Sequence, residues 1–209
     1  MTIRFSTREL RDLAVAWVVL GAAFAIFFAG GGNRAIDSLL SEGVVVPLVV
    51  SLVTAGFGFL LHELAHKVIA VRFGQVAKFR ADYGMLFLAL VSALVGFLFA
   101  APGAVHHRGR LTPREHGLIA LAGPVTNGLL AAVFAPVYVV GLAAGSPLLS
   151  LVGGRGVAIN LFLAAFNLIP FGALDGRTVL DWSKGVFVLA FVPTAVLAVV
   201  VVFVLGIGF

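Results

Sequence analysis

The chain has 209 residues, of which 61% are apolar and only 11% are charged, with a net charge of +5. Soluble domains carry about 25% charged residues, so this composition excludes an ordinary soluble protein and indicates an integral membrane protein. The Lys and Arg residues lie between apolar runs without forming a basic cluster, so nucleic acid is not an expected partner. There is no cysteine, so any bound metal must be held by His and carboxylate side chains.

A membrane-spanning helix needs about 20 apolar residues. Five segments are predicted to span: 13–32, 45–73, 116–144, 156–172 and 186–207. The first follows a basic stretch that is compatible with a cleaved signal peptide. Because that apolar run is long enough to span and no A-x-A site follows a short core, we favour an uncleaved membrane helix. The longest polar stretch is only a loop, so we expect one transmembrane domain over residues 1–209.

A sixth apolar segment, 84–105, is also long enough to cross. If it crosses, the 14 Lys and Arg residues divide into 8 and 6 between the two sides; if it returns to the same side, they divide into 12 and 2. Positive charge prefers the cytoplasmic side, so the second arrangement is favoured. We therefore predict an all-α polytopic membrane protein, a bundle of five to six membrane helices in which 84–105 is re-entrant or buried. The N-terminus is then cytoplasmic.

The stretch "LLHELAHKVIA" places polar side chains near the end of the second predicted span. His62 and His66 are four residues apart, so they share one face of a helix and can bind one metal ion. Glu63 lies beside them, where it can accept a proton from water. Alternatively, this is a helix end whose polar residues reach water, which suits Lys67 as a snorkelling side chain but explains His62 and Glu63 less well.

A catalytic zinc site has three protein ligands and one open position. Asp175 is a candidate for the third ligand, because it follows an apolar helix that Pro170 interrupts and lies between Gly172 and Gly176. Alternatively, Asp175 only caps the next helix. The residues alone leave both interpretations open.

Together these motifs resemble those of the site-2 proteases, a family of intramembrane zinc metalloproteases. The family carries HExxH on one membrane helix and N-x-x-P-x-x-x-L-D-G on a later one. The second motif is matched by Asn167, Pro170, Leu174, Asp175 and Gly176. A third motif, G-x-x-x-N, is matched by Gly123 and Asn127. The resemblance covers about residues 45–185, which would form the catalytic core.

The resemblance implies that His62, His66 and Asp175 bind one zinc ion per chain and that Glu63 is the general base. It also implies that Asn167 orients the substrate or stabilises the oxyanion, and that Asn127 has a structural or substrate-positioning role. The substrate would be a transmembrane protein that is cut within or next to a membrane helix, in the lipid bilayer. The enzyme itself would be a multi-pass protein of the cell membrane.

Two departures from the family pattern are visible. The sequence contains neither a PDZ insert nor a nucleotide-sensing domain, so it resembles the minimal prokaryotic form, including the archaeal one. The apolar segment 84–105 is expected to replace the re-entrant β-hairpin of better-known members.

The competing hypothesis is a zinc-binding membrane protein without proteolytic activity, such as a transporter or sensor. His106, His107 and His116 could then supply a second site, although we expect them to be loop histidines near the membrane surface. A transporter does not require Glu63 beside the ligands or the N-x-x-P-x-x-x-L-D-G motif. These features favour the protease.

Overall fold

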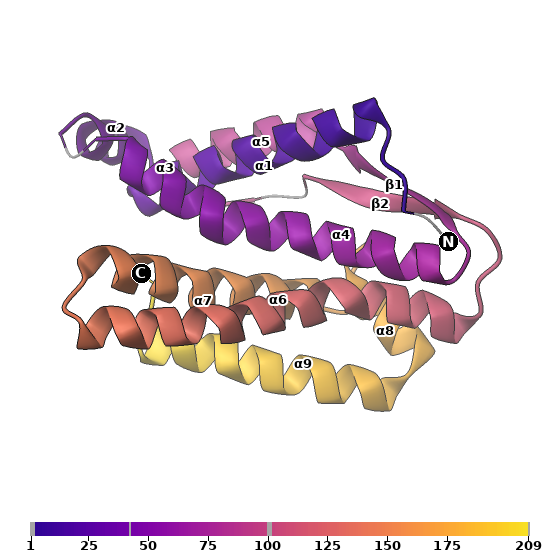
Figure 1. Cartoon of the computed structure of the whole chain (residues 1–209). Coiled ribbons are helices and arrows are strands. Elements are labelled where there is room, and N and C mark those ends of the chain that lie inside the picture. Colours follow the sequence, from indigo (N-terminus) through magenta and orange to yellow (C-terminus); the bar gives the residue numbers. More distant parts are fainter. Residues whose placement is uncertain (1–2, 42, 100–101, 209) are drawn as a thin grey trace.

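The computed structural model describes residues 3–41, 43–99 and 102–208 and shows a bundle of long helices with a small sheet at one end (Figure 1). The elements in chain order are α1 (Thr7–Phe28), α2 (Gly32–Ser41), α3 (Val45–Ser51), η1 (Leu52–Gly56), α4 (Phe57–Arg72), β1 (Val76–Ala81), α5 (Tyr83–Leu94), β2 (Gly103–Arg108), α6 (Pro113–Ala143), α7 (Pro147–Asn167), α8 (Asp175–Trp182), α9 (Lys184–Val199) and η2 (Val200–Val204).

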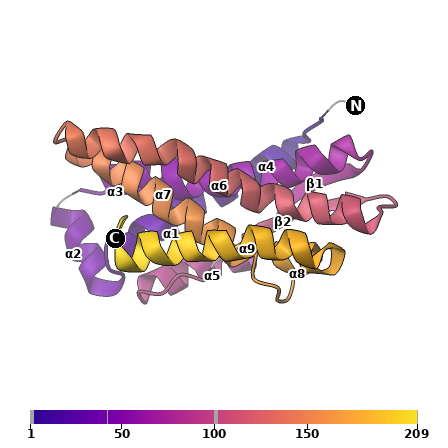
Figure 2. The ribbon, with the colours of Figure 1, turned by 90° about the horizontal axis from the view of Figure 1, so that it is seen from below.

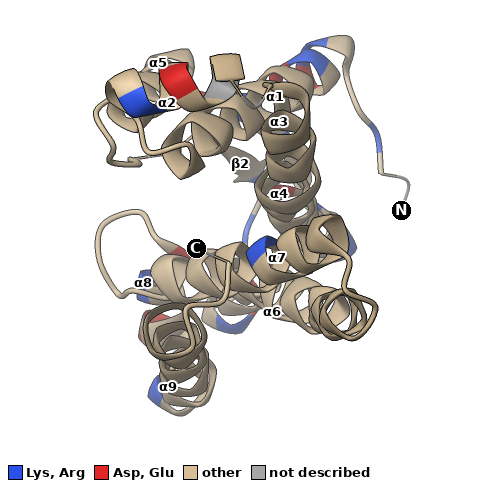
Figure 3. Cartoon of the chain, turned by 90° about the vertical axis from the view of Figure 1, so that its left-hand side faces the viewer, with Lys and Arg blue, Asp and Glu red and all other residues tan. Residues whose placement is uncertain are grey.

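Within the described residues, five helical stretches are long and apolar enough to cross a membrane. They are α1, the continuous helix formed by α3, η1 and α4, then α6, α7, and α9 with η2. Figure 3 shows how few positions of the ribbon carry charge. The predicted all-α membrane bundle is confirmed, and the protein is embedded in a membrane.

The predicted spans agree with the observed helices to within six residues at each end, with one exception. The span predicted at 156–172 belongs to α7, which begins nine residues earlier at Pro147. A Cβ atom on Gly153 would overlap the backbone of Tyr138 in α6, so this glycine lets the two helices approach closely. Arg155 consequently lies inside α7 rather than in a loop, with its guanidinium 4.3 Å from the ring centroid of Phe28.

The segment 84–105 enters and leaves the bundle at the same end. Strands β1 and β2 pair antiparallel with Ala81 opposite Gly103, and the amide of Asp82 donates to the carbonyl of Pro102 over 3.0 Å. Between them α5 has only 12 residues and packs against α1. The re-entrant prediction is confirmed; residues 100–101 of the segment lie outside the described residues.

The expectation that 84–105 replaces a β-hairpin is wrong, because β1 precedes that segment and β2 begins within it at Gly103. In β1 the side chains of Ala77 and Phe79 are buried while Val76 and Lys78 are exposed, which is the alternation of a strand with one covered face. Only the first four residues of β1 alternate in this way, between a helix and a strongly apolar run, so a strand is hard to predict from the sequence here.

Helix α4 lies between two groups of helices (Figure 1). On one side it faces α1 and the sheet, and on the other it packs against α6, which pairs along its length with α7. Figure 1 shows α1 at the top of the bundle and α9 at the bottom, and in Figure 2, seen from below, α9 lies in front. The end with the sheet carries 12 of the 14 basic residues: Arg4, Arg8, Arg11, Lys67, Arg72, Lys78, Arg80, Arg108, Arg110, Arg114, Arg177 and Lys184.

Candidate metal centre

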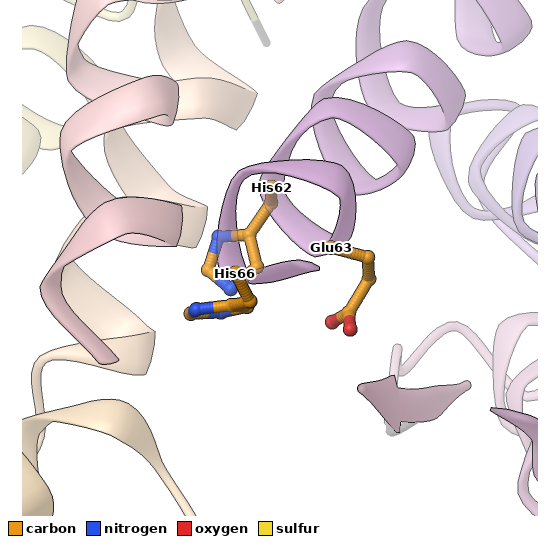
Figure 4. A group of neighbouring side chains, drawn as sticks. All are labelled: His62, Glu63 and His66. Atoms are coloured by element: carbon orange, nitrogen blue, oxygen red, sulfur yellow. The ribbon is translucent and has the colours of Figure 1, made fainter. Parts of the chain in front are cut away.

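His62 and His66 project from consecutive turns of α4, with Glu63 beside them (Figure 4). All three side chains are buried, and their potential ligand atoms lie within 4.8 Å of one another. The two imidazole rings are 4.6 Å apart between centroids. The helical spacing in HELAH therefore brings the two histidines together, as predicted.

Helix α6 orients both imidazole rings. Nδ1 of His66 lies 2.7 Å from the backbone carbonyl oxygen of Ile119, and Nδ1 of His62 lies 2.6 Å from Oδ1 of Asn127. A carbonyl oxygen only accepts hydrogen bonds, so each Nδ1 carries a proton and donates it. The Nε2 atom of each ring is thus left with its lone pair, as a metal ligand requires.

Asp175, which belongs to the second motif, lies next to the two histidines of the first motif. Its Oδ2 atom lies 3.3 Å from Nε2 of His62 and 3.3 Å from Nε2 of His66. Asp175 is the first residue of α8, and the N-cap is Leu174, so the alternative role as a helix cap is not observed. A Cβ atom on Gly176 would overlap the carbonyl of Leu168, which explains why glycine follows the aspartate where the chain turns into α8.

The residues fit a zinc ion. Two imidazole nitrogens and one carboxylate oxygen form a donor set that zinc prefers in catalytic sites. Gly123 of α6 faces the same point: a Cβ atom there would lie 2.5 Å from Nε2 of both His62 and His66. The Oε2 atom of Glu63 is buried and has no hydrogen-bond partner among the described residues, so it is available to a group bound in the site.

The site opens into a cavity of about 1280 Å³ between the two groups of helices. Glu63, Asp175 and Asn167 lie in a wall that is otherwise largely apolar and includes Phe162 and Phe166. Asn167 ends α7, and its Nδ2 atom donates to the carbonyl of Leu163 over 2.9 Å. The structure therefore brings all the predicted ligands, the predicted base and Asn167 to one cavity.

Asn127 is placed differently from the other predicted site residues. It is fully buried at 0% exposure behind His62, and it is not part of the cavity wall. Of the two roles that the sequence suggested, this position suits the structural one, because the amide contacts the predicted ligand His62 and not the cavity. Sequence reasoning missed its partner Asn160, an asparagine within an apolar helix.

The three remaining histidines were expected in a loop, and this expectation is wrong. His106 and His107 lie on β2 and His116 lies in the first turns of α6, and all three line the same cavity. The rings of His107 and His116 are 5.6 Å apart between centroids. Burial, together with the neighbouring His116, lowers the pKa of His107, which favours the neutral ring near pH 7.

Lys67 does not snorkel to water as the sequence suggested. Its side chain is 1% exposed, and its Nζ atom lies 2.5 Å from Oε1 of Glu9 and 2.8 Å from the carbonyl of Arg4. The same Oε1 atom accepts a hydrogen bond from the amide of Phe79 in β1 over 2.9 Å. The buried Glu9 thus connects α1, α4 and the sheet, which positions the sheet beside the metal centre.

Two histidines and an aspartate that converge beside a glutamate, inside an apolar helical bundle, define a membrane protein of the zinc metalloprotease class. Known proteins support this class. Over 192 residues, or 91% of the chain, it is 39% identical to "Putative zinc metalloprotease MJ0611" of Methanocaldococcus jannaschii, of which 92% is covered. The chain therefore belongs to this zinc metalloprotease family, the site-2 protease-like family that its motifs indicated.

Two further relatives are less similar. The chain is 31% identical over 150 residues to "Putative zinc metalloprotease YwhC" of Bacillus subtilis, covering 64% of the chain and 67% of that protein. It is also 31% identical over 148 residues to "Putative zinc metalloprotease Rip3" of Mycobacterium tuberculosis, covering 70% of the chain but 32% of that protein. No family model and no solved structure matches the chain significantly.

Proposed function

We propose that the protein is an intramembrane zinc endopeptidase, which hydrolyses a peptide bond within or next to a transmembrane helix of a membrane-bound substrate. The observation that supports this most directly is the depth of the metal centre. His62 lies ten residues before the end of α4 at Arg72, or about 15 Å along the helix axis. With Arg72 placed at the edge of a hydrocarbon core about 30 Å thick, this depth is near the middle of the core.

The cavity suits such a substrate. Its wall is mainly apolar, with aromatic side chains from α7, and its polar groups include the predicted metal ligands and Glu63. A transmembrane helix hides its carbonyl groups in its own backbone hydrogen bonds, so it must unwind locally before one carbonyl reaches the ligands. We therefore expect helix-weakening residues near the cleaved bond.

The chain's own residues supply the proton transfers. When bound, zinc lowers the pKa of a water molecule towards ~7 and polarises a carbonyl group. Glu63 accepts the proton of the attacking water at its carboxylate and passes it to the nitrogen of the leaving amine. Asn167 has one amide N–H committed to Leu163, so its second N–H is left to donate to the developing oxyanion.

The basic residues orient the protein in the membrane. Because 12 of the 14 lie at the end that carries the sheet, we propose that this end and the N-terminus face the cytoplasm of a cell-membrane protein. A reporter fused after Arg110 should read as cytoplasmic, and one fused after Ser146 as external. The opposite pattern would refute this orientation.

Cleavage in proteoliposomes tests the function. Wild-type protein is reconstituted with a panel of single-span substrates and compared with Glu63→Gln, which keeps the side-chain shape but removes the base. We expect cleavage by the wild type, loss of cleavage in Glu63→Gln, and equal zinc content in both. Asp37→Asn, an exposed site on α2, is the matched carboxylate control and should cleave normally.

The outcomes separate the protease from the zinc transporter or sensor. Cleavage that persists in Glu63→Gln would refute Glu63 as the base. Uptake of zinc into the vesicles without cleavage of any substrate would refute the protease and favour the transporter.

A further inference from the structure

A row of buried, hydrogen-bonded asparagine side chains leads from the metal centre into the bundle. Asn127 of α6 accepts a hydrogen bond from His62 and donates through Nδ2 to Oδ1 of Asn160 on α7 over 2.9 Å. The same Nδ2 atom also donates to the carbonyl of Gly58 on α4 over 3.1 Å. Asn160 in turn donates through Nδ2 to the carbonyl of Gly156 over 2.9 Å. Both asparagines are 0% exposed.

The backbone carbonyls of Gly58 and Gly156 determine the orientation of the two asparagine amides. The carbonyl of Gly156 only accepts, so the NH₂ group of Asn160 must face it and Oδ1 of Asn160 must face Asn127. The NH₂ group of Asn127 therefore meets two acceptors, the Oδ1 atom of Asn160 and the carbonyl of Gly58. This leaves Oδ1 of Asn127 facing His62, whose Nδ1 must then carry the proton.

We propose that Asn160 is a positioning residue for the metal centre: it holds the Asn127 amide in the one orientation that keeps Nε2 of His62 free to bind the ion. This inference rests on the zinc site of the proposed function but not on proteolysis. Among the described residues Asn160 forms no hydrogen bond to a predicted ligand, and it is not part of the cavity wall, so it acts through Asn127.

The packing around Asn160 supports its role in orienting the Asn127 amide. A Cβ atom on Gly58 would lie 2.7 Å from Oδ1 of Asn160, so α4 has a glycine where the amide of α7 approaches, one turn before His62. A buried amide in a membrane is costly unless it is paired, and this one is paired at both ends. Generic helix association through polar side chains would give hydrogen bonds between helices, but it would not require a particular orientation at a ligand.

The test changes Asn160 and measures zinc binding rather than cleavage. In Asn160→Ser the short hydroxyl can still bond the carbonyl of Gly156 within its own helix, but it cannot reach Asn127. Asn160→Asp, when protonated, reproduces both hydrogen bonds and serves as the rescue variant. Thr54→Val is the matched control, because Thr54 is a fully buried hydroxyl in η1 whose one hydrogen bond among the described residues is to the carbonyl of Val50 over 2.8 Å.

Zinc affinity is measured by competition with a chelator, and the ligand geometry by the absorption spectrum of the Co²⁺-substituted protein. Loss of an outer partner of a ligating histidine typically lowers metal affinity 10–100-fold. Because Asn160 acts through Asn127, we expect about a tenfold loss in Asn160→Ser with an altered Co²⁺ spectrum. Asn160→Asp and Thr54→Val should retain wild-type affinity and spectrum.

Wild-type affinity and an unchanged spectrum in Asn160→Ser would overturn the proposal, as would an equal loss in Thr54→Val. If Asn160→Ser does not fold, Asn160→Asp decides: the proposal requires that it restores folding, zinc affinity and spectrum together. Absence of cleavage with the expected zinc affinities would instead count against the protease and leave this inference standing.

Discussion

Gly123→Ala adds a single methyl group at the centre of the metal site. The glycine lies in α6 opposite the histidines, and its added Cβ would be 2.5 Å from Nε2 of His62 and equally 2.5 Å from Nε2 of His66. Zinc binds imidazole nitrogen at about 2.0–2.1 Å, so the methyl group would occupy the place of the ion.

The expected loss of zinc affinity follows from the distances. Ordinary contact begins at 3.4 Å, so each ring would have to retreat by about 0.9 Å. Neither ring can do so freely, because His62 is held by Asn127 at 2.6 Å and His66 by the carbonyl of Ile119 at 2.7 Å. Loss of an outer partner alone costs 10–100-fold in affinity, so blocking the place of the ion should cost more than about 100-fold.

The assay compares zinc content and unfolding of the purified variants. Alanine is favoured over glycine in a helix interior by about 1 kcal/mol, which offsets part of the overlap, so the metal-free variant should remain folded. Gly128→Ala is the matched control: it lies in the same helix, and its added Cβ meets no atom within 4 Å. Gly128→Ala should bind zinc like the wild type.

A Gly123→Ala protein with wild-type zinc affinity would refute the placement of the ion between the two Nε2 atoms and α6. Loss of zinc in both glycine variants would point to the helix as a whole rather than to the site.

Three further predictions concern the ligands and the buried ion pair. Asp175→Ala removes one ligand, so metal analysis should find little zinc in the variant, and undiminished zinc would exclude Asp175 from the ligand set. Chelation should lower the melting temperature of the wild type, since an ion at 100 times its Kd adds about 2.7 kcal/mol, but should leave that of Asp175→Ala unchanged. Lys67→Met leaves the buried Glu9 without its partner and should lower the free energy of unfolding by about 3–5 kcal/mol, measured by chemical denaturation. Adding Glu9→Gln to Lys67→Met should recover most of this loss. Equal stability of Lys67→Met and wild type would contradict a buried ion pair.

The site was easier to predict from the sequence than its surroundings. His62, Glu63 and His66 are joined by helical spacing alone, which any helix of that sequence must reproduce. Asp175 could be proposed only from its broken-helix context and from the family resemblance, because a contact across more than a hundred residues has no local periodicity. The re-entrant segment was predictable from the distribution of positive charge, which is a property of the whole chain.

The errors share a physical origin. Lys67 was read as a snorkelling residue because its partner Glu9 lies 58 positions away, and only tertiary structure brings the two together. The span predicted at 156–172 leaves out Gly153, and the structure shows that this glycine lies inside α7 and permits close packing on α6. Asn160 carries no sequence signal beyond being polar in an apolar helix.

The shared carboxylate of Glu9 has a consequence for how the protein is assembled. A ribosome produces α1 before α4, so Glu9 arrives at the membrane before Lys67 and before the strand that contains Phe79. Glu9 lies in the first turn of α1, and before α4 and β1 dock it has neither its lysine partner nor the amide of Phe79. During biogenesis, therefore, the step that docks α4 with its histidines also pairs the carboxylate of Glu9 in α1. A chain that fails to dock its metal-binding helix therefore also leaves Glu9 of α1 without its lysine partner.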